Sequence, residues 1–213
     1  GKGGAVFNED QRPFPMWAAN MAVSSRGADH LKGLVPVEKN GRKDISMAWF
    51  GRPEAGEIHG IALKGAASAR AEHVNCAINS TGICIFMPTR DILVFELAAL
   101  APGLTALTGL PFDDADLYAI GERTYNLEKA FNSRLGLRRQ DDRLCHRWMN
   151  VPAPAGPGKG MKAADYLTEV LDEYYEYKGW DKETSLQTRQ KLVELDLPDV
   201  ADVLAQEQAL AEP

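Results

Sequence analysis

Apolar residues recur at helical spacing along much of the chain, most clearly between residues 111 and 136. The positions of this repeat alternate between steps of three and four: Leu117, Ile120, Thr124, Leu127, Phe131 and Leu135. On a helix such steps place the residues in one stripe. The acidic run that follows Pro111 suits the start of a helix, and Gly136 suits its end. The pattern predicts one long helix whose stripe of Leu117, Ile120, Leu127 and Phe131 is buried.

Weaker patterns predict further helices and no convincing strand. The expected helices cover residues 16–33, 62–79, 90–100, 162–178, 185–195 and 199–211. Gly33 and Gly179 suit two of the ends, Thr89 suits a start, and Pro198 separates the last two helices. Residues 34–60, which glycine and proline interrupt, are expected to form a long loop with a short helix. The predicted fold class is mainly α, with residues 1–15 as a connecting segment and residues 16–213 as a helical domain.

The composition allows a packed core and argues against some classes of function. The 213 residues are 45% hydrophobic and 25% charged, which is ordinary for a globular protein. A net charge of −6 disfavours nonspecific binding to nucleic acid, which needs a basic surface. No apolar run reaches the ~18–20 residues of a membrane span. The start, Gly1-Lys2-Gly3-Gly4, has neither a methionine nor a signal-peptide core, so we expect part of a longer protein.

The cysteines are the first candidates for chemistry. Cys76, Cys84 and Cys145 are an odd number without the spacing of a disulfide scaffold, so a reducing cytoplasm is expected. Cys84 ends the run Asn79-Ser80-Thr81-Gly82-Ile83-Cys84. A thiolate ligates iron, but a [4Fe–4S] cluster needs four such ligands, and the chain has no Cys-x-x-Cys. On the motif alone, Cys84 is better explained as a small buried hydrophobe and Asn79 as a turn residue.

A second group of candidates lies in Ser25-Arg26-Gly27-Ala28-Asp29-His30-Leu31-Lys32. Arg26 and His30 are four residues apart, so they share a face if the segment is helical. Cationic side chains such as Arg26 and Lys32 suit a phosphate-bearing cofactor, and a histidine suits proton transfer near neutral pH. On spacing alone, an exposed and charged helix end explains these residues equally well.

These two runs stand in a longer order of blocks. Downstream of them follow Arg123-Thr-Tyr-Asn-Leu-Glu-Lys-Ala-Phe-Asn-Ser-Arg134, Arg138-Arg-Gln-Asp-Asp142, Asp172-Glu-Tyr-Tyr175 and Gly179-Trp-Asp181. In this order, from about residue 12 to about residue 200, the blocks resemble the C-terminal part of the tungsten-dependent aldehyde:ferredoxin oxidoreductase family. The resemblance implies a C-terminal helical, cofactor-binding domain of that type.

The resemblance also implies cofactors and the residues that hold them. The cofactors are a bis-pterin tungsten centre, with molybdenum left open, and a [4Fe–4S] cluster. Cys84 is then the fourth cluster ligand, and the other three come from an earlier domain. His30 is the implied catalytic residue beside the metal. The implied cofactor-binding residues are Arg26, Gly27, Lys32, Asn79, Gly82, Ile83 and Ile85. The family usually has Asp where Asn79 stands; both accept hydrogen bonds, but only Asn also donates.

The activity implied by the resemblance is oxidation of aldehydes to carboxylic acids, with electrons leaving through the cluster to ferredoxin or an electron-transfer subunit. The N-terminal domains of the same enzyme are further implied partners. One alternative is the tungsten subunit of an ATP-independent benzoyl-CoA (aryl-CoA) reductase, which the departures at Asn79, Ile83 and Cys145 favour. A second alternative is a helical interaction domain without a cofactor. The retained Arg26 and Cys84, with Lys32 and Gly82, weigh against it.

The remaining motifs are interpreted as structural. Adjacent residues rarely share a metal, so Cys145 and His146 are not expected to be ligands. Cys76 is expected in the core. The glycine-rich run 156–160 lacks the ending of a phosphate-binding loop and is expected to be an ordinary loop. The dense charges between 123 and 142 are expected to position helices around the cofactor cleft: Arg123, Glu128, Arg134, Arg138, Arg139, Asp141 and Asp142.

Overall fold

A computed structural model describes residues 9–27, 29–33, 37–86 and 97–212. The α-helices are α1 (Pro15–Val23), α2 (Lys43–Phe50), α3 (Lys64–Ser80), α5 (Leu97–Thr108), α6 (Asp114–Arg134), α7 (His146–Asn150), α8 (Leu167–Lys178), α9 (Arg189–Glu194) and α10 (Pro198–Gln206). The short 3₁₀ helices are η1 (His30–Gly33), η2 (Glu54–Gly56), η3 (Arg139–Asp141) and η4 (Ala163–Asp165). Within these ranges two isolated bridges are the only β pairing, so the mainly α prediction is confirmed.

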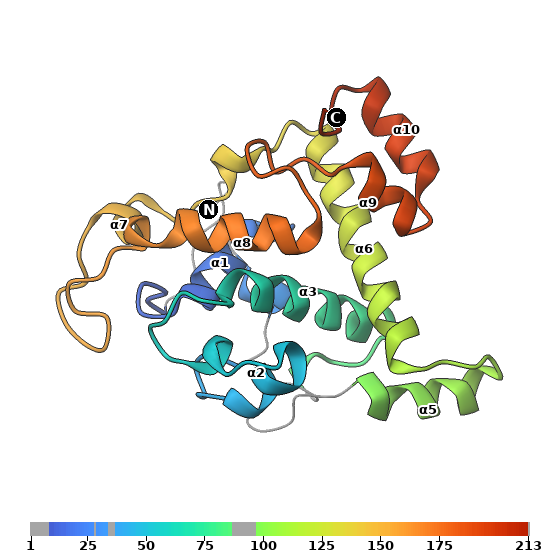
Figure 1. Cartoon of the computed structure of the whole chain (residues 1–213), viewed down its shortest axis with the longest axis horizontal. Helices are drawn as coiled ribbons and strands as arrows, with labels where there is room; N and C mark the ends of the chain where they lie inside the picture. Colours follow the sequence, from blue (N-terminus) through green and yellow to red (C-terminus); the bar gives the residue numbers. More distant parts are fainter. Residues whose placement is uncertain (1–8, 28, 34–36, 87–96, 213) are drawn as a thin grey trace.

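Helix α3 is the centre of the molecule (Figure 1), where α1, α6, α8 and η1 pack against it. Its neighbours approach very closely because glycines stand at the crossings. A Cβ on Gly121 of α6 would lie 1.9 Å from the carbonyl oxygen of His73, and one on Gly65 would lie 2.2 Å from that of Val170 in α8. Both crossings therefore bring backbone against backbone, and a larger residue at either site would separate the helices.

The limits of α6 agree with the prediction, but its buried face does not. The side chain of Asp113 accepts from the amide of Asp116, whose carboxylate accepts from the amide of Asp113, and this capping box starts the helix. Leu117 is buried, whereas Leu127, Phe131 and Leu135 are 47%, 61% and 68% exposed. Ile120 is only partly buried. The predicted burial of the whole stripe is therefore wrong.

Beyond Leu117, the buried face of α6 instead carries residues that are either small or polar: Gly121, Tyr125, Asn126, Lys129, Ala130 and Ser133. Partners far away in sequence make this possible. The indole nitrogen of Trp180 donates to Asn126 at 3.1 Å, and the Lys129 ammonium donates to the Ser185 hydroxyl at 3.0 Å. Because hydrogen bonds pair the side chains of Asn126 and Lys129, their burial is tolerated and the apolar stripe turns outward, although the buried Ser133 hydroxyl lacks a partner among the described residues.

Other element limits also differ from the prediction. Residues 16–33 are not one helix, because α1 ends at Val23, a turn follows in which Gly27 has φ +88°, and the chain resumes as η1. Gly33 does end η1. Residues 37–60 contain α2 and η2 rather than one short helix. The predicted start of a helix at Thr89, and residues 90–96, lie outside the described residues; α5 begins at Leu97.

Toward the C-terminus the helices are close to those expected. Helix α8 ends before Gly179, whose φ of +66° closes it as predicted, while residues 163–165 form η4 instead of its first turn. Pro198 is the first residue of α10 and not a separator before it, because proline suits the first turn of a helix. None of the described helices combines the length and the apolar content that crossing a membrane requires.

A buried ionic cluster joins the three central helices. Glu72 of α3 and Lys178 of α8 are both fully buried, with Oε2 and Nζ 3.0 Å apart. The hydroxyls of Tyr125 and Tyr174 donate to the same carboxylate at 2.8 and 2.7 Å. Nζ of Lys178 also lies 2.9 Å from Nε2 of His73. Burial raises the pKa of Glu72 and lowers the pKa of Lys178, and their mutual attraction opposes both shifts.

We expect Lys178→Met to destabilise the protein by about 3–5 kcal/mol, because it leaves the Glu72 carboxylate buried without its cation. The matched control is Lys182→Met. The Lys182 ammonium lies 3.9 Å from Glu176, and both side chains are exposed, so we expect at most about 1 kcal/mol. Urea unfolding followed by circular dichroism measures both values. Equal losses for the two variants would contradict the role given to the buried pair.

Candidate functional site

The run that contains Cys84 begins at the C-terminus of α3. The helix ends at Ser80, and the amide of Gly82 donates to the carbonyl oxygen of Asn79 at 3.1 Å. Gly82 has φ +76°, a conformation that favours glycine, and no neighbouring atom lies within 4 Å of the place a Cβ would take. The chain therefore turns sharply here and leaves open space beside Gly82.

Cys84 points outward between two anchored residues. Ile85 is buried in a cluster with Ile78 and Leu117, and Ile83 packs partly against the same cluster. The side chain of Cys84 is exposed, as are Asn79 and Gly82. Of the three cysteines Cys84 is the exposed one, since Cys76 is buried and Cys145 is half-buried. The structure therefore presents the Cys84 thiol at the surface, on a turn that the core holds in place.

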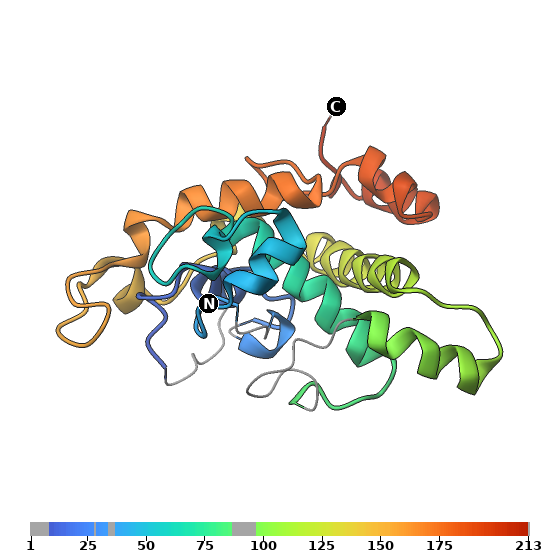
Figure 2. The same ribbon diagram turned by 60° about the horizontal axis from the view of Figure 1, so that its bottom comes forward.

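Segment 25–33 lies along the same end of α3. The side-chain amide of Asn75 donates to the carbonyl oxygen of Leu31 at 3.2 Å, and Asn75 is one turn before Asn79. From α6, the amide of Asn132 donates to the carbonyl oxygen of Ser25 at 2.8 Å. Figure 2 shows η1 and the turn after α3 on the same, lower side of the molecule. Segment 25–33 therefore contacts α3 one turn before Asn79, where the run that contains Cys84 begins.

The three charged candidates of segment 25–33 have different environments. The exposed Arg26 guanidinium pairs with Asp29. The His30 ring stacks on Trp17, with centroids 5.9 Å apart and an interplanar angle of 16°, and burial lowers the pKa of His30. Lys32 is buried, and its ammonium pairs with Glu128. Arg26 and His30 do not share a helical face as predicted, because α1 ends before both.

Cys76 has the core position expected of it. Its sulfur lies 4.0 Å from Nζ of Lys32, and burial raises the pKa of Cys76 to about 12, so the thiol remains neutral. Cys145 precedes α7 and packs partly against the largest core cluster, which agrees with a structural role. Residues 156–160 form a loop, also as predicted.

The charged residues of 123–142 do not form one network. Arg134 pairs with Glu207 and Arg139 with Asp172, both at 2.6 Å. Arg138 donates to the carbonyl oxygens of Ser133 and Leu137. Among these charged residues, Glu128 is the one that contacts segment 25–33 in the described structure. The Arg134 and Arg139 pairs join α6 to the residue after α10 and η3 to α8, so these charges do connect elements distant in the sequence, and their role around a cofactor cleft stays a prediction.

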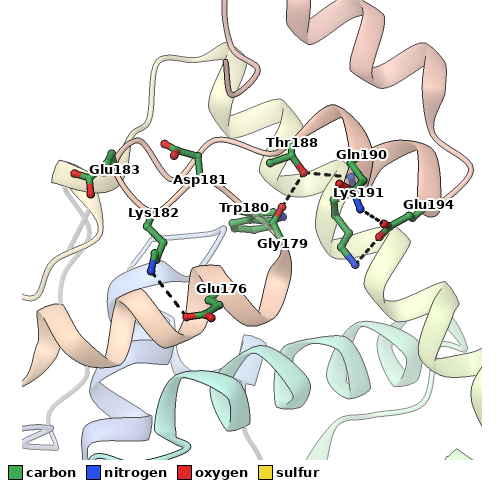
Figure 3. Close-up of a pocket in the computed structure, with 10 residues that line it drawn as sticks. All are labelled: Glu176, Gly179, Trp180, Asp181, Lys182, Glu183, Thr188, Gln190, Lys191 and Glu194. Atoms are coloured by element: carbon green, nitrogen blue, oxygen red, sulfur yellow. Dashed lines mark hydrogen bonds and ion pairs between the residues drawn. The ribbon is translucent and has the colours of Figure 1, made fainter. Parts of the chain in front are cut away.

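A charged hollow in the described structure lies elsewhere. Figure 3 shows the residues that line it, between the end of α8 and α9. Its volume is about 510 Å³. Lys182 pairs with Glu176 at 3.9 Å, and Lys191 pairs with Glu194 at 3.3 Å. Because its cations are paired and none of the sequence-predicted site residues lines it, we do not assign the site to this hollow.

The residues around α3 fit one side of a larger cofactor site. Within the described ranges no three His, Cys, Asp or Glu side chains gather closely enough to hold a metal. Two buried polar atoms beside segment 25–33 have no hydrogen-bond partner among the described residues: Nε1 of Trp17 and Oδ1 of Asn75. Sequence reasoning missed both, together with Asn132, and it named Glu128 only among the charges expected to position helices. Helical spacing of four, from Asn75 to Asn79 and from Glu128 to Asn132, was the available signal.

Comparisons with known proteins cover this whole region. The profile of the family described as "Aldehyde ferredoxin oxidoreductase, domains 2 & 3" matches residues 1–197. The tungsten-containing aldehyde ferredoxin oxidoreductases of Pyrococcus furiosus and Pyrococcus horikoshii are 30% and 31% identical to this chain over 182 residues. Each alignment covers 84% of this chain and 27% of the relative. The chain thus spans about a quarter of these relatives' length.

A solved structure has the same fold. The active-site complex BamBC of benzoyl coenzyme A reductase, with 1,5-dienoyl-CoA, superposes with a TM-score of 0.67. The match covers 98% of this chain and 33% of that one at 18% identity, which is a likeness of fold. The helical architecture and the family profile agree with the blocks recognised in the sequence, and the chain belongs to the aldehyde ferredoxin oxidoreductase family.

Proposed function

We propose that this chain is the part of a tungsten-dependent oxidoreductase that covers one side of a bis-pterin tungsten cofactor and supplies one ligand to a [4Fe–4S] cluster. The observation that carries the proposal is the exposed thiol of Cys84 on a turn that Ile83 and Ile85 anchor to the core at the end of α3, the helix against which η1 packs. The relatives at 30% identity are named as tungsten-containing enzymes. The N-terminal domains of the same enzyme would supply the other cluster ligands.

Each site residue has a role that its environment supports. The Cys84 thiolate would ligate iron, and the exposed Asn79 amide can both accept from and donate to a pterin ring. The open space beside Gly82 admits a cofactor close to the backbone. The side chain of Ile85 is buried, so Ile85 would contact the cofactor through its backbone. Ile83 is half-buried, so part of its side chain could contact the cofactor as well. When bound, the tungsten centre supplies two-electron chemistry and the cluster one-electron transfer.

Segment 25–33 would bind the phosphate groups of the cofactor and would accept the proton that the reaction releases. The exposed Arg26, with the backbone of Gly27, suits a phosphate group. The ammonium of Lys32 is already paired with Glu128, so Lys32 supports the segment more directly than it reaches a phosphate. His30 is neutral near pH 7 because burial lowers its pKa, and a neutral imidazole can accept a proton.

The favoured reaction is oxidation of an aldehyde and water to a carboxylic acid, two electrons and two protons. The electrons would pass through the cluster to ferredoxin or to an electron-transfer subunit. A reducing cytoplasm would keep the Cys84 sulfur reduced and available to ligate iron. Molybdenum could replace tungsten without changing the roles of these residues.

The alternative reaction is reduction of an aryl-CoA thioester, as in an ATP-independent benzoyl-CoA reductase. One observation favours it, namely the likeness to BamBC over 98% of this chain. Identity favours aldehydes, since the relatives at 30% identity are named as aldehyde enzymes and the reductase is 18% identical. A cofactor-free interaction domain is a weaker alternative, because it gives no reason for an exposed thiol on an anchored turn.

We expect Cys84→Ser in the complete enzyme to lower the iron content and to change the [4Fe–4S] signal in electron paramagnetic resonance, because serine is a poorer iron ligand. Cys145→Ser is the matched control, since Cys145 packs against the core. An unchanged signal with full iron content in Cys84→Ser would make Cys84 structural.

We expect His30→Asn to lower turnover by roughly 10²–10⁴-fold with metal content intact. The pH profile gives a second readout. Protonated His30 cannot accept a proton, so turnover falls as the pH drops through its pKa. Burial places that pKa below the ordinary 6.5, and the acid limb of the wild type should lie below pH 6.5. Near-normal turnover by His30→Asn would contradict a catalytic role, and stacking on Trp17 would then be the remaining role of His30.

The substrate is decided by assaying the complete enzyme with a viologen dye, first with a panel of aldehydes and then with dienoyl- and benzoyl-coenzyme A. We expect aldehyde turnover, in which the dye is reduced. Turnover of thioesters without turnover of aldehydes would replace the favoured reaction with the alternative. If the purified enzyme contained neither tungsten nor iron, both the favoured and the alternative reaction would be contradicted.

A further inference from the structure

Segment 25–33 has little regular structure to hold it in place. In its described residues, 25–27 and 29–33, the hydrogen bonds within the segment are local, while the His30 ring stacks on Trp17 of α1. The amide of Gly27 donates to the carbonyl oxygen of Ser24 at 3.2 Å, and the amide of Leu31 donates to the carboxylate of Asp29 at 2.8 Å. These contacts shape the segment but do not orient it. The positions of Arg26 and His30 relative to α3 must therefore depend on contacts from other elements.

The strongest of those contacts converge on one carboxylate of α6. Oε2 of Glu128 accepts from the Ser25 hydroxyl, and Oε1 pairs with the Lys32 ammonium. Ser25 and Lys32 lie on either side of Arg26 and His30. One carboxylate therefore holds both ends of the part of the chain that carries the two candidate site residues.

Burial makes this clamp stronger than a surface ion pair. The side chain of Lys32 is 7% exposed and that of Glu128 is 33% exposed. Cys76, the other group beside the ammonium, is a neutral thiol because burial raises its pKa to about 12. Removing the charge of Glu128 would leave a buried ammonium without the carboxylate that it meets, which strongly disfavours the present position of the segment.

Weaker contacts complete the clamp. Asn132, one turn after Glu128, donates to the carbonyl oxygen of Ser25 at 2.8 Å, and Asn75 of α3 donates to that of Leu31 at 3.2 Å. These bonds reach the backbone only, and neutral hydrogen bonds contribute less than bonds to a charged group. Glu128 is therefore the residue whose change should move the segment with least effect on the helices.

We infer that Glu128 is a positioning residue of the site: by holding Ser25 and Lys32, its carboxylate sets the orientation of Arg26 and His30 without touching cofactor or substrate. The inference rests on the proposed function. In this role Lys32 is the cation that the clamp requires. A misplacement of about 1 Å in a catalytic group can cost on the order of 10²-fold in rate, so a residue of this kind affects turnover from a distance.

The test compares Glu128→Gln with Glu122→Gln in the complete enzyme. Glutamine at 128 keeps an acceptor for Ser25 and removes the charge that Lys32 needs. Glu122 is on the same helix but pairs with Lys191 at 3.4 Å, away from the segment. The readouts are tungsten and iron content, kcat and KM, and amide hydrogen exchange of peptides from segment 25–33 and from α8.

We expect Glu128→Gln to retain its metals, to exchange faster in segment 25–33 but not in α8, and to lose on the order of 10²-fold in kcat. Glu122→Gln should match the wild type in each readout. In a His30→Asn background the effect of Glu128→Gln on kcat should shrink, because a residue that acts through His30 has less to position. In Glu128→Gln with His30 present, the acid limb of the pH profile should move up toward 6.5, because a released His30 is more exposed to solvent.

His30 has neighbours other than solvent that bear on this shift. Asp29 and Glu9 raise the pKa of His30, and Lys39, whose ammonium lies over the Trp17 ring, lowers it. Neither variant changes these groups. Faster exchange in α8 as well, or loss of metal, would make Glu128 a general structural residue and overturn the inference. Unchanged kcat, or a full and additive effect in the His30→Asn background, would overturn it too. Failure of the proposed function is distinguishable, because the wild type itself would then lack metal or turnover.

Discussion

The close approach of α3 to α6 and α8 is the constraint on which the rest of the structure depends. Glycine at 65 and at 121 allows backbone to contact backbone, since a Cβ at either place would collide with a carbonyl oxygen. At that separation the carboxylate of Glu72 reaches the hydroxyls of Tyr125 and Tyr174 and the ammonium of Lys178. A buried charge is tolerable only with such partners, so the glycines and the ionic cluster require each other.

The same crossing also builds the candidate site. One turn after Glu72, α3 carries Asn75 and Cys76, and the turn after that carries Asn79. Along α6, Glu128 and Asn132 follow Tyr125 in the same way. The segment that carries Arg26 and His30 lies against both helices at this level. The site is therefore an extension of the core, and a change in the spacing of the helices would move it.

The site faces outward, which suits the proposed function. The exposed groups at the end of α3 are a thiol, a carboxamide and an open glycine turn, and a guanidinium lies on the neighbouring segment. A chain that spans about a quarter of its relatives' length would need the remainder of the enzyme to complete such a site. These groups would hold the shared cofactor in either reaction. In the proposed function, the choice between aldehyde and aryl-CoA would depend on the part of the enzyme that shapes the substrate pocket.

The sequence by itself determined what depends on nearby residues. The capping box of Asp113 and Asp116 and the glycine after the last turn set the limits of α6, and Gly179 ends α8, because capping is a contact between residues three or four apart. The order of motifs was likewise enough to identify the family. Tertiary structure decided which face of α6 is buried, because the polar groups on that face obtain their hydrogen bonds from Trp180 and Ser185, about fifty residues away. It also turned Lys32 inward to Glu128, since an ion pair between residues 96 apart leaves no periodic pattern in the sequence.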